Sequence, residues 1–428
     1  MSYRAVEVGH ARPLLSIHGK VSVTRLAYRH RGEANLHPAD AELNLPAELH
    51  SHGLRRLAAI ESARGSFEES RLAIERTSGV KLGKRQVESL VYAAAVDFDE
   101  FYAYRRSLGP TPSEDDERVL CLSADGKGIV MRPEALRPGT ARAAARSEHR
   151  LSSRLSSGEK NGRKRMSEVV SCFEVKPEPR SVDDVLAHRR DGPGHKPAPK
   201  AVEKWTMASV VEDAKNVIGK LFDEAERRDP GHRRTWVMLV DGACHQIDVA
   251  KAEALRRGVK LHILCDLIHV LEYLWGAAWS FFDHGDQAAE AWVLEKAREV
   301  LSGNASRVAA AIRCKATALG LSATARKNAD AAADYLLAKA AYLDYPAALS
   351  GGWPIASGVI DGACRYIVAD RMAITGARWG LQGAESVLRL RALRANGDFD
   401  AYWSFHLAQE RRRVHESRYS GGVIPRAA

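Results

Sequence analysis

The sequence lacks the cysteine pairs, the long apolar runs and the N-terminal leader that mark several common classes of protein. None of its six cysteines forms a C-x-x-C pair, which argues against a zinc ribbon or a thioredoxin-type redox site. No uninterrupted apolar stretch reaches about 18 residues, the length of a membrane-spanning helix. The N-terminus has no apolar core of the kind found in signal peptides. We therefore expect a cytoplasmic protein with reduced thiols and no membrane contact.

An excess of positive charge is what the sequence does have. Lys and Arg number 64 against 54 Asp and Glu, which gives a net charge of +10. Such an excess favours a polyanionic partner, with nucleic acid as the first candidate. Hydrophobic residues make up 45% and charged residues 28% of the 428 residues, a composition typical of globular domains. The length allows two or three such domains.

The N-terminal quarter divides into two parts. Residues 1–50 are polar and show no regular pattern, whereas residues 51–110 carry apolar residues at helical spacing. A helix, a short glycine-containing turn and a second helix that starts at Lys84, Arg85 and Gln86 have the shape of a helix-turn-helix. An ordinary helical hairpin with a solvated basic turn explains the same pattern.

Strand signals begin after residue 117. Residues 118–132, RVLCLSADGKGIVMR, predict a strand, a tight Asp-Gly turn and a second strand. Residues 136–165 are basic and poor in large apolar residues, which predicts a mobile loop. A third strand is expected from residue 166, followed by a Pro/Gly-rich linker over 177–204.

An alternating pattern follows the linker. An amphipathic helix is expected over 207–228, and then buried strands ending in VMLVDG and HILCD, each followed by a helix. This β-α-β-α order implies parallel strands with helices on the faces of the sheet. Residues 281–351 are helical and rich in alanine, like an insertion into the α/β unit. Residues 396–428 form a basic C-terminal tail.

Three aspartates stand out by their positions in this pattern. Asp125 follows the first strand in SADGKG, Asp241 ends a later strand in VMLVDG, and Asp361 lies at the start of a helix in GVIDGACR. Carboxylates at the ends of parallel strands gather at one edge of the sheet. Their mutual repulsion would be relieved by two Mg²⁺ or Mn²⁺ ions, which can activate a water or a 3′-hydroxyl for phosphoryl transfer. Asp-Gly is also a common turn signal, so the spacing alone leaves both explanations open.

Four segments resemble bacterial insertion-sequence transposases of the ISKra type, which are DDE transposases related to the Mutator-like group. They read VLCLSADGKG, WVMLVDGACHQ, LCDLIHVLEYLW and GVIDGACRYIVADRMAITGARWGLQGAESVLRLRALRANGDFDAYWSFH. The resemblance runs from about residue 46 to about residue 415. It implies an RNase H-like catalytic domain over 115–280 and 352–395, interrupted by the helical insertion and preceded by a DNA-binding region.

The resemblance also assigns roles to individual residues. Asp125 and Asp241 match the first two catalytic, metal-binding aspartates. Asp266 and His269 match a C/D-x-x-H signature, in which the histidine would lie near the scissile phosphate. A capping aspartate and a solvent-facing histidine are the alternative. Trp275 could stack on an unpaired base or belong to the core.

The third carboxylate departs from the family pattern. The family has glutamate where this sequence has Asp361. Aspartate is one methylene shorter, so its oxygens could fall about 1.5 Å short of a metal. We therefore expect either a weakened enzyme or a local shift that compensates, with Glu385 as a less favoured substitute ligand.

The predicted DNA contacts lie in three places. Arg163, Lys164 and Arg165 would neutralise phosphates without base specificity. The helix that begins near Lys84 would read terminal inverted repeats in the major groove. Arg378 and Trp379 belong to the family motif and complete the predicted contacts.

The sequence thus predicts a nucleoid-associated DNA transposase. It would cleave the ends of an insertion sequence and join their 3′-hydroxyls to target DNA, using two Mg²⁺ or Mn²⁺ ions. Because two ends must be cut together, we expect a homodimer or a larger synaptic complex. A catalytically silent transposase-derived DNA-binding protein and an RNase H-like nuclease without strand transfer are the alternatives.

Overall fold

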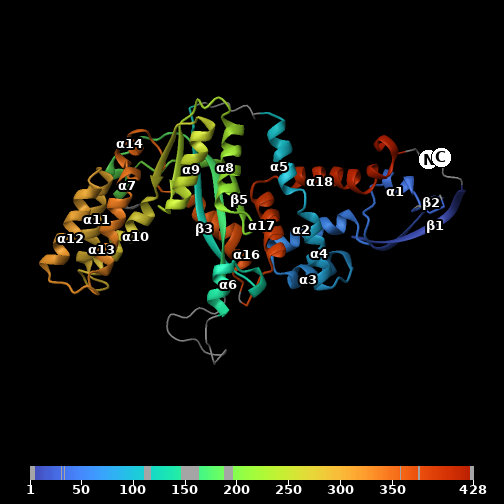
Figure 1. Cartoon of the computed structure of the whole chain (residues 1–428), viewed down its shortest axis with the longest axis horizontal. Coiled ribbons are helices and arrows are strands. Elements are labelled where there is room, and N and C mark those ends of the chain that lie inside the picture. The colour runs from blue at the N-terminus through green and yellow to red at the C-terminus, as the bar shows by residue number, and fades with distance from the viewer. Residues whose placement is uncertain are drawn as a thin grey trace.

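The computed structural model describes residues 5–29, 31–32, 34–109, 117–145, 163–187, 196–356, 358–374 and 376–424. The molecule is elongated, with a β-hairpin at one end, a five-stranded sheet in the middle and a helical block at the other end (Figure 1). Within the described residues, no helix combines the length and the apolarity needed to cross a bilayer.

The N-terminal segment, which shows no regular pattern in the sequence, holds regular structure in its described residues. β1 (Ala5–Ser16) and β2 (Gly19–Arg29) form an antiparallel hairpin, and α1 (Pro38–Glu42) follows it. Most of the hairpin side chains are exposed or half-buried, and Val8 is 81% exposed. A hairpin without a buried face leaves no strong apolar alternation in the sequence, which explains why it was missed.

The predicted helices over 51–110 are present as α2 (His52–Arg64), α3 (Phe67–Ser78), α4 (Lys84–Ala94) and α5 (Phe98–Ser107). Ser66 and Glu69 form a capping box at the start of α3, and Gly79 ends it with a positive φ of 70°. The buried side chains of these helices belong to the same hydrophobic core as one face of the sheet.

The central sheet has the strand order β5-β4-β3-β6-β7. β3 is antiparallel to β4 and parallel to β6, β4 is antiparallel to β5, and β6 is parallel to β7. Their bounds are β3 (Val119–Val130), β4 (Lys164–Val175), β5 (Ala201–Ser209), β6 (Trp236–Val240) and β7 (Leu261–Cys265).

The predicted Asp-Gly turn in 118–132 was wrong, because β3 runs through it as one strand. Asp125 pairs with Val169 and Gly126 pairs with Glu168. The long ladder with β4 satisfies the backbone groups on both sides of this dipeptide and overrides its local turn preference.

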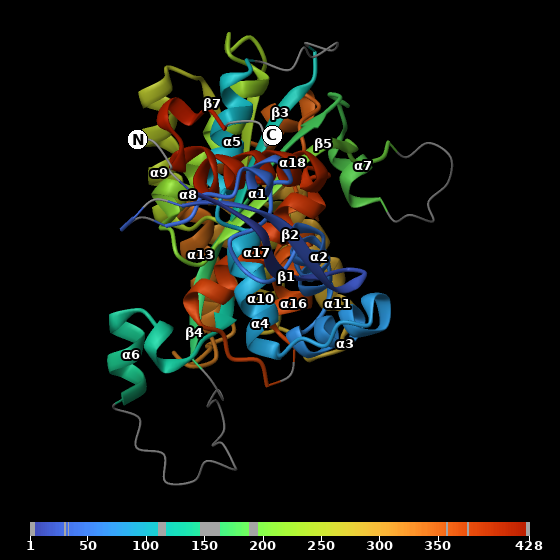
Figure 2. The ribbon, with the colours of Figure 1, turned by 90° about the vertical axis from the view of Figure 1, so that its right-hand side faces the viewer.

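Two predicted loops also contain regular structure. The basic segment 136–165 holds α6 (Pro138–Ala145) and the start of β4, and the linker 177–204 holds α7 (Val182–Leu186) and the start of β5. The helix expected from residue 207 begins later, as α8 (Ala214–Arg228), because residues 201–209 form β5. The rest of the predicted loop and linker, 146–162 and 188–195, lies outside the described residues. α6 lies beyond the ends of β3 and β4, at the margin of the molecule (Figure 2).

The two faces of the sheet belong to two hydrophobic cores, as the alternation of side chains along β3 requires. Leu120 and Leu122 belong to one core with α8 and α9 (Cys244–Arg257), whereas Val119 and Cys121 belong to the other. The second core contains α10 (Leu267–Ala278) and the predicted helical insertion. The insertion consists of α11 (Gln287–Leu301), α12 (Ala305–Ala318), α13 (Lys327–Ala338) and α14 (Tyr345–Ser350).

The chain returns from the insertion to the sheet through one long helix. α15 (Gly358–Ala363) continues as a π turn (Cys364–Ala369) and then as α16 (Asp370–Met372). α17 (Leu381–Ala395) then packs against β5, α2 and α4, and α18 (Phe399–Val414) runs towards the N-terminal hairpin.

Candidate active site

Asp125 and Asp241 occupy equivalent positions on adjacent parallel strands. Ala124 and Val240 form the last pair between β3 and β6, and each is followed directly by one of the two aspartates. Asp125 Oδ1 accepts the amide of Gly126 at 2.6 Å, and Asp241 Oδ1 accepts the amide of Ala243 at 2.7 Å. The strand register therefore brings these two predicted residues together at the carboxyl end of the parallel strands.

Asp361 approaches the same place from a helix. It lies in α15, and burial raises its pKa, to which repulsion by Asp125 adds while His269 and Lys127 act in the opposite direction. Cys364 in the adjoining π turn donates its thiol to Asp125 Oδ2 at 3.2 Å. Short π turns inside α-helices are frequent at functional sites.

Glu168 is an acidic neighbour that the sequence did not single out. Burial raises its pKa to about 7, and the charges of Asp125 and Asp241 add to the effect. Gln246 in α9 donates its amide to Glu168 Oε1 at 2.7 Å, which partly offsets the rise. Glu168 looked like any residue of a predicted strand, because the pairing of β3 with β4 is not visible in the sequence.

The donor set of this site has the chemistry of an Mg²⁺ or Mn²⁺ site, since it consists of carboxylate oxygens. An ion held by the protein also needs several such groups within reach of one point. Among the described residues, no three Asp, Glu, His or Cys side chains are placed to hold a metal ion together. Asp125, Asp241 and Glu168 instead accept hydrogen bonds from a neighbouring amide, thiol or side chain, as described above.

The two residues of the C/D-x-x-H signature, Asp266 and His269, have different surroundings. Asp266 is buried and caps α10 by accepting the amide of Ile268 at 2.8 Å, which is the arrangement of a capping aspartate. His269 is half-exposed, lies 3.2 Å from Glu272 through Nδ1, and interacts electrostatically with Asp361. Only His269 thus faces the acidic site.

The predicted major-groove residues lie at the start of α4. Lys84, Arg85 and Gln86 are exposed, and Gln86 closes a cap by accepting the amide of Gly83 at 2.7 Å. Neither Lys84 nor Arg85 forms an ion pair with another described residue. Two unpaired cations therefore remain available at this helix end.

The basic triplet does not act as one unit. Arg163 and Lys164 are exposed, and neither forms an ion pair with a described residue. Arg165 is half-buried and donates to the carbonyls of Val210 and Ala135, at 2.7 and 3.3 Å. Its guanidinium therefore already joins β4 to two neighbouring segments.

The motif tryptophans pack against protein. Trp379 is 5% exposed, donates to the carbonyl of Met372 at 3.1 Å and lies under the Arg371 guanidinium. Trp275 is half-buried and stacks on Trp279 at 5.2 Å between centroids. Trp379 is therefore a core residue in this structure, whereas Arg378 beside it is exposed.

Glu385 is fully engaged elsewhere. It is buried and accepts hydrogen bonds from Ser209 Oγ and from the amides of Val210 and Val211, at 2.9 to 3.3 Å. These bonds tie α17 to the end of β5, so the glutamate has a structural role here.

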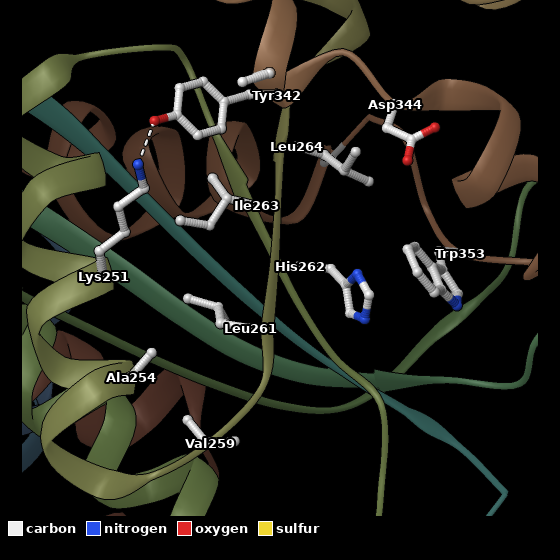
Figure 3. A pocket seen from close by; sticks show the side chains of 11 residues that line it. Lys251, Ala254, Val259, Leu261, His262, Ile263, Leu264, Tyr342, Asp344 and Trp353 are labelled. Atoms are coloured by element: carbon white, nitrogen blue, oxygen red, sulfur yellow. Dashed lines mark hydrogen bonds between the residues drawn. The ribbon is translucent and has the colours of Figure 1, made fainter.

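A cavity of about 400 Å³ lies beside the outer edge of β7 (Figure 3). His262 and Trp353 lie close together there, with ring centroids 4.5 Å apart, and Lys251 donates to the hydroxyl of Tyr342 at 2.6 Å. None of the predicted catalytic residues lines this cavity, so it is distinct from the acidic site.

Comparison with known proteins gives a distant structural likeness. The chain is similar to a Drosophila P element transposase strand transfer complex. The two share 9% sequence identity and a TM-score of 0.27, over 82% of this chain and 79% of that chain. A TM-score this low does not establish a common fold. No family model and no curated protein matches the sequence.

Proposed function

We propose that this chain is a DNA transposase, a polynucleotidyl transferase that cleaves the ends of an insertion sequence and joins their 3′-hydroxyls to target DNA. The observation that carries the proposal is the placement of Asp125 and Asp241 directly after the last residue pair between β3 and β6. Open α/β sheets bind ligands at the carboxyl ends of their strands, and two aspartates at that edge suit phosphodiester chemistry.

The arrangement of the sheet supports an RNase H-like core. Three antiparallel strands, β3, β4 and β5, are followed by β6 and β7, which run parallel to β3. The helical insertion separates this sheet from the helix that carries Asp361. The order is compatible with the catalytic domain that the sequence resemblance implies.

In this proposal, each residue of the site has a role in cation or phosphate binding. Asp125 and Asp241 would bind the cations at the scissile phosphate, Asp361 would complete the set, and His269 would donate to a phosphate oxygen. Bound Mg²⁺ or Mn²⁺ would supply activation of a water or a 3′-hydroxyl and stabilisation of the leaving oxygen. Because the carboxylates are not placed to hold one ion together in this structure, cation dependence has to be measured directly.

Unpaired cations offer a path for DNA towards the site. Lys127 follows Asp125 by two residues in β3 and is exposed, as are Arg163 and Lys164 near the start of β4. None of them forms an ion pair with a described residue. Exposed cations that form no ion pair can neutralise phosphates and release counterions.

A silent DNA-binding protein is the second candidate. The absence, among the described residues, of three side chains placed to hold one ion and the shorter Asp361 favour it over a nuclease without strand transfer. In that case the cationic surface would bind DNA although the acidic site performs no chemistry.

A strand-transfer assay tests the proposal. The substrate is the DNA that flanks the gene for this chain, mixed with a supercoiled target plasmid, with Mg²⁺ or with EDTA. Joined products that require Mg²⁺ and disappear in Asp125→Asn and Asp241→Asn support the transposase. Cut products alone indicate a nuclease, and shifted but intact DNA indicates a binding protein. Either result overturns the proposal.

A further inference from the structure

The turn that carries Asp241 lies against the helical insertion. Tyr335 in α13 donates its hydroxyl to the backbone carbonyl of Asp241 at 3.1 Å. Gly242, with a φ of +98°, lies so close to the ring that a Cβ there would come within 3.1 Å of Tyr335. A Cβ here would lie tight against the ring, and the positive φ would strain the backbone of any residue with a side chain.

The same tyrosine also contacts the helix that carries His269. Its ring stacks on Tyr273 of α10, with centroids 4.0 Å apart and planes 16° apart. Burial is the main cause that raises the pKa of the Tyr335 hydroxyl, so the group stays protonated and acts as a donor at neutral pH. Tyr335 thus links the Asp241 turn to α10.

A second residue, at the C-terminal cap of α13, reinforces this contact. Lys339, one helical turn after Tyr335, is buried and donates to the Cys244 thiol at 3.0 Å. Cys244 is the first residue of α9, directly after the turn. The insertion therefore contacts both ends of the turn over residues 241–244. Tyr335 binds Asp241 at the start of the turn, and Lys339 binds Cys244 at its end.

We propose that the helical insertion positions Asp241 through Tyr335, which makes Tyr335 a positioning residue of the candidate active site. The inference rests on the proposed function for its catalytic consequence, and on the contacts alone for its structural part. Hydrogen-bonding partners that orient a ligand residue are worth about 10- to 100-fold in affinity or activity.

The chain supplies a matched control in Tyr345. This tyrosine lies in α14 of the same insertion and donates its hydroxyl to the backbone carbonyl of Cys265 at 2.9 Å, at the end of the neighbouring strand β7. Tyr335→Phe and Tyr345→Phe thus each remove one hydroxyl that donates to a backbone carbonyl, and the Tyr335 hydroxyl also interacts with the side chain of Cys265. Only the first bond leads to a predicted metal ligand.

The test compares the two variants in three measurements. We expect Tyr335→Phe to slow single-turnover DNA cleavage by about 10- to 100-fold, with unchanged DNA affinity, and to speed amide exchange in residues 241–244. Tyr345→Phe should leave the cleavage rate and that exchange as in the wild type. Equal slowing by both variants, or unchanged exchange in Tyr335→Phe, overturns the inference. If the wild type cuts no DNA, the proposed function is wrong, and the exchange measurement still decides whether Tyr335 holds the turn.

Discussion

The acidic residues of the candidate site are held in two different ways. Asp125 lies within β3, paired with Val169 of β4, and Asp241 directly follows the last residue of β6. Asp361 lies on a six-residue α-helical segment that passes into a π turn. A residue in a strand, or next to one in a turn that other side chains hold, has little freedom to move, whereas a helix with a π turn can change the direction of a side chain by a local shift in hydrogen bonding. The sheet-held pair is therefore the fixed part of the site, and the helix-held residue is the adjustable part.

The largest effect is expected from the sheet-held pair. Asp125→Asn or Asp241→Asn removes a charge at a fixed position, so neighbouring residues cannot replace it. DNA cleavage should fall by more than the roughly 100-fold that a 1 Å misplacement costs, with little change in DNA affinity. Single-turnover cleavage and gel-shift titrations measure the two quantities. Asp248→Asn, on an exposed position of α9, is the control. An equal loss of cleavage rate in the Asp248→Asn variant would contradict the assignment.

A third sheet-held carboxyl, Glu168, should appear in the pH dependence of stability. Its pKa rises from 4.5 to about 7 in the folded protein, so the folded state keeps a proton that the unfolded state has lost. Stability should therefore fall as the pH rises from about 4.5 to about 7. Glu168→Gln abolishes this titration, and above pH 7 it should raise the free energy of unfolding by up to about 3 kcal/mol.

Denaturant unfolding of both proteins at several pH values measures this difference. Glu174→Gln is the matched control, because Glu174 lies on the same strand but pairs with Arg234 at 3.0 Å. That variant should lose stability, since it leaves a buried guanidinium without its partner. A Glu168→Gln protein that is less stable than the wild type at pH 8 would contradict the prediction.

The helix-held Asp361 should respond in the opposite direction from the pair. Asp361→Glu restores the side-chain length of the family and should raise the cleavage rate, by up to about 100-fold if the reach of the carboxylate is about 1 Å too short. Asp370→Glu, further along the same helix, is the control for a general effect of the longer side chain. A lower rate in Asp361→Glu would show that the π turn has already adapted the site to aspartate.

Local and periodic signals made much of the fold predictable. The buried strands β6 and β7, the helices that follow them and the alanine-rich insertion all carry strong patterns over many residues. The hairpin of residues 5–29 and strand β5 lacked such a pattern, and the Asp-Gly dipeptide in β3 carried a misleading one. What decides these three cases is pairing with distant segments, which a single sequence does not display.

The candidate site was predictable to the extent that strand ends define it. Asp125 and Asp241 could be named because they follow apolar strands, and the register places them together as predicted. Glu168 and Tyr335 could not be named, because one depends on the register of β4 and the other on the packing of a helix nearly 100 residues away. Trp379 was named for its motif, yet its burial depends on contacts with Arg371 and Met372.

The smallest effects are expected at the cations, where strand-held and helix-held positions can again be compared. Each lost phosphate contact lowers the slope of log affinity against log salt by roughly 0.9. Arg163→Ala/Lys164→Ala at the start of β4 and Lys84→Ala/Arg85→Ala on α4 should each lower the slope by roughly 1 to 2. Arg307→Ala is the control, since Arg307 already pairs with Glu299 at 2.6 Å.

The dependence of binding on the DNA sequence distinguishes the cation pair on α4 from the pair at the start of β4. If α4 reads the terminal repeats, its variant should also lose the preference for end DNA over unrelated DNA, because base contacts carry the discrimination. The β4 variant should weaken binding to both DNAs equally. Arg165→Ala should mainly lower the thermal stability, because its guanidinium bonds to Val210 and Ala135. An unchanged salt slope in both double variants would place the DNA path on another surface of the molecule.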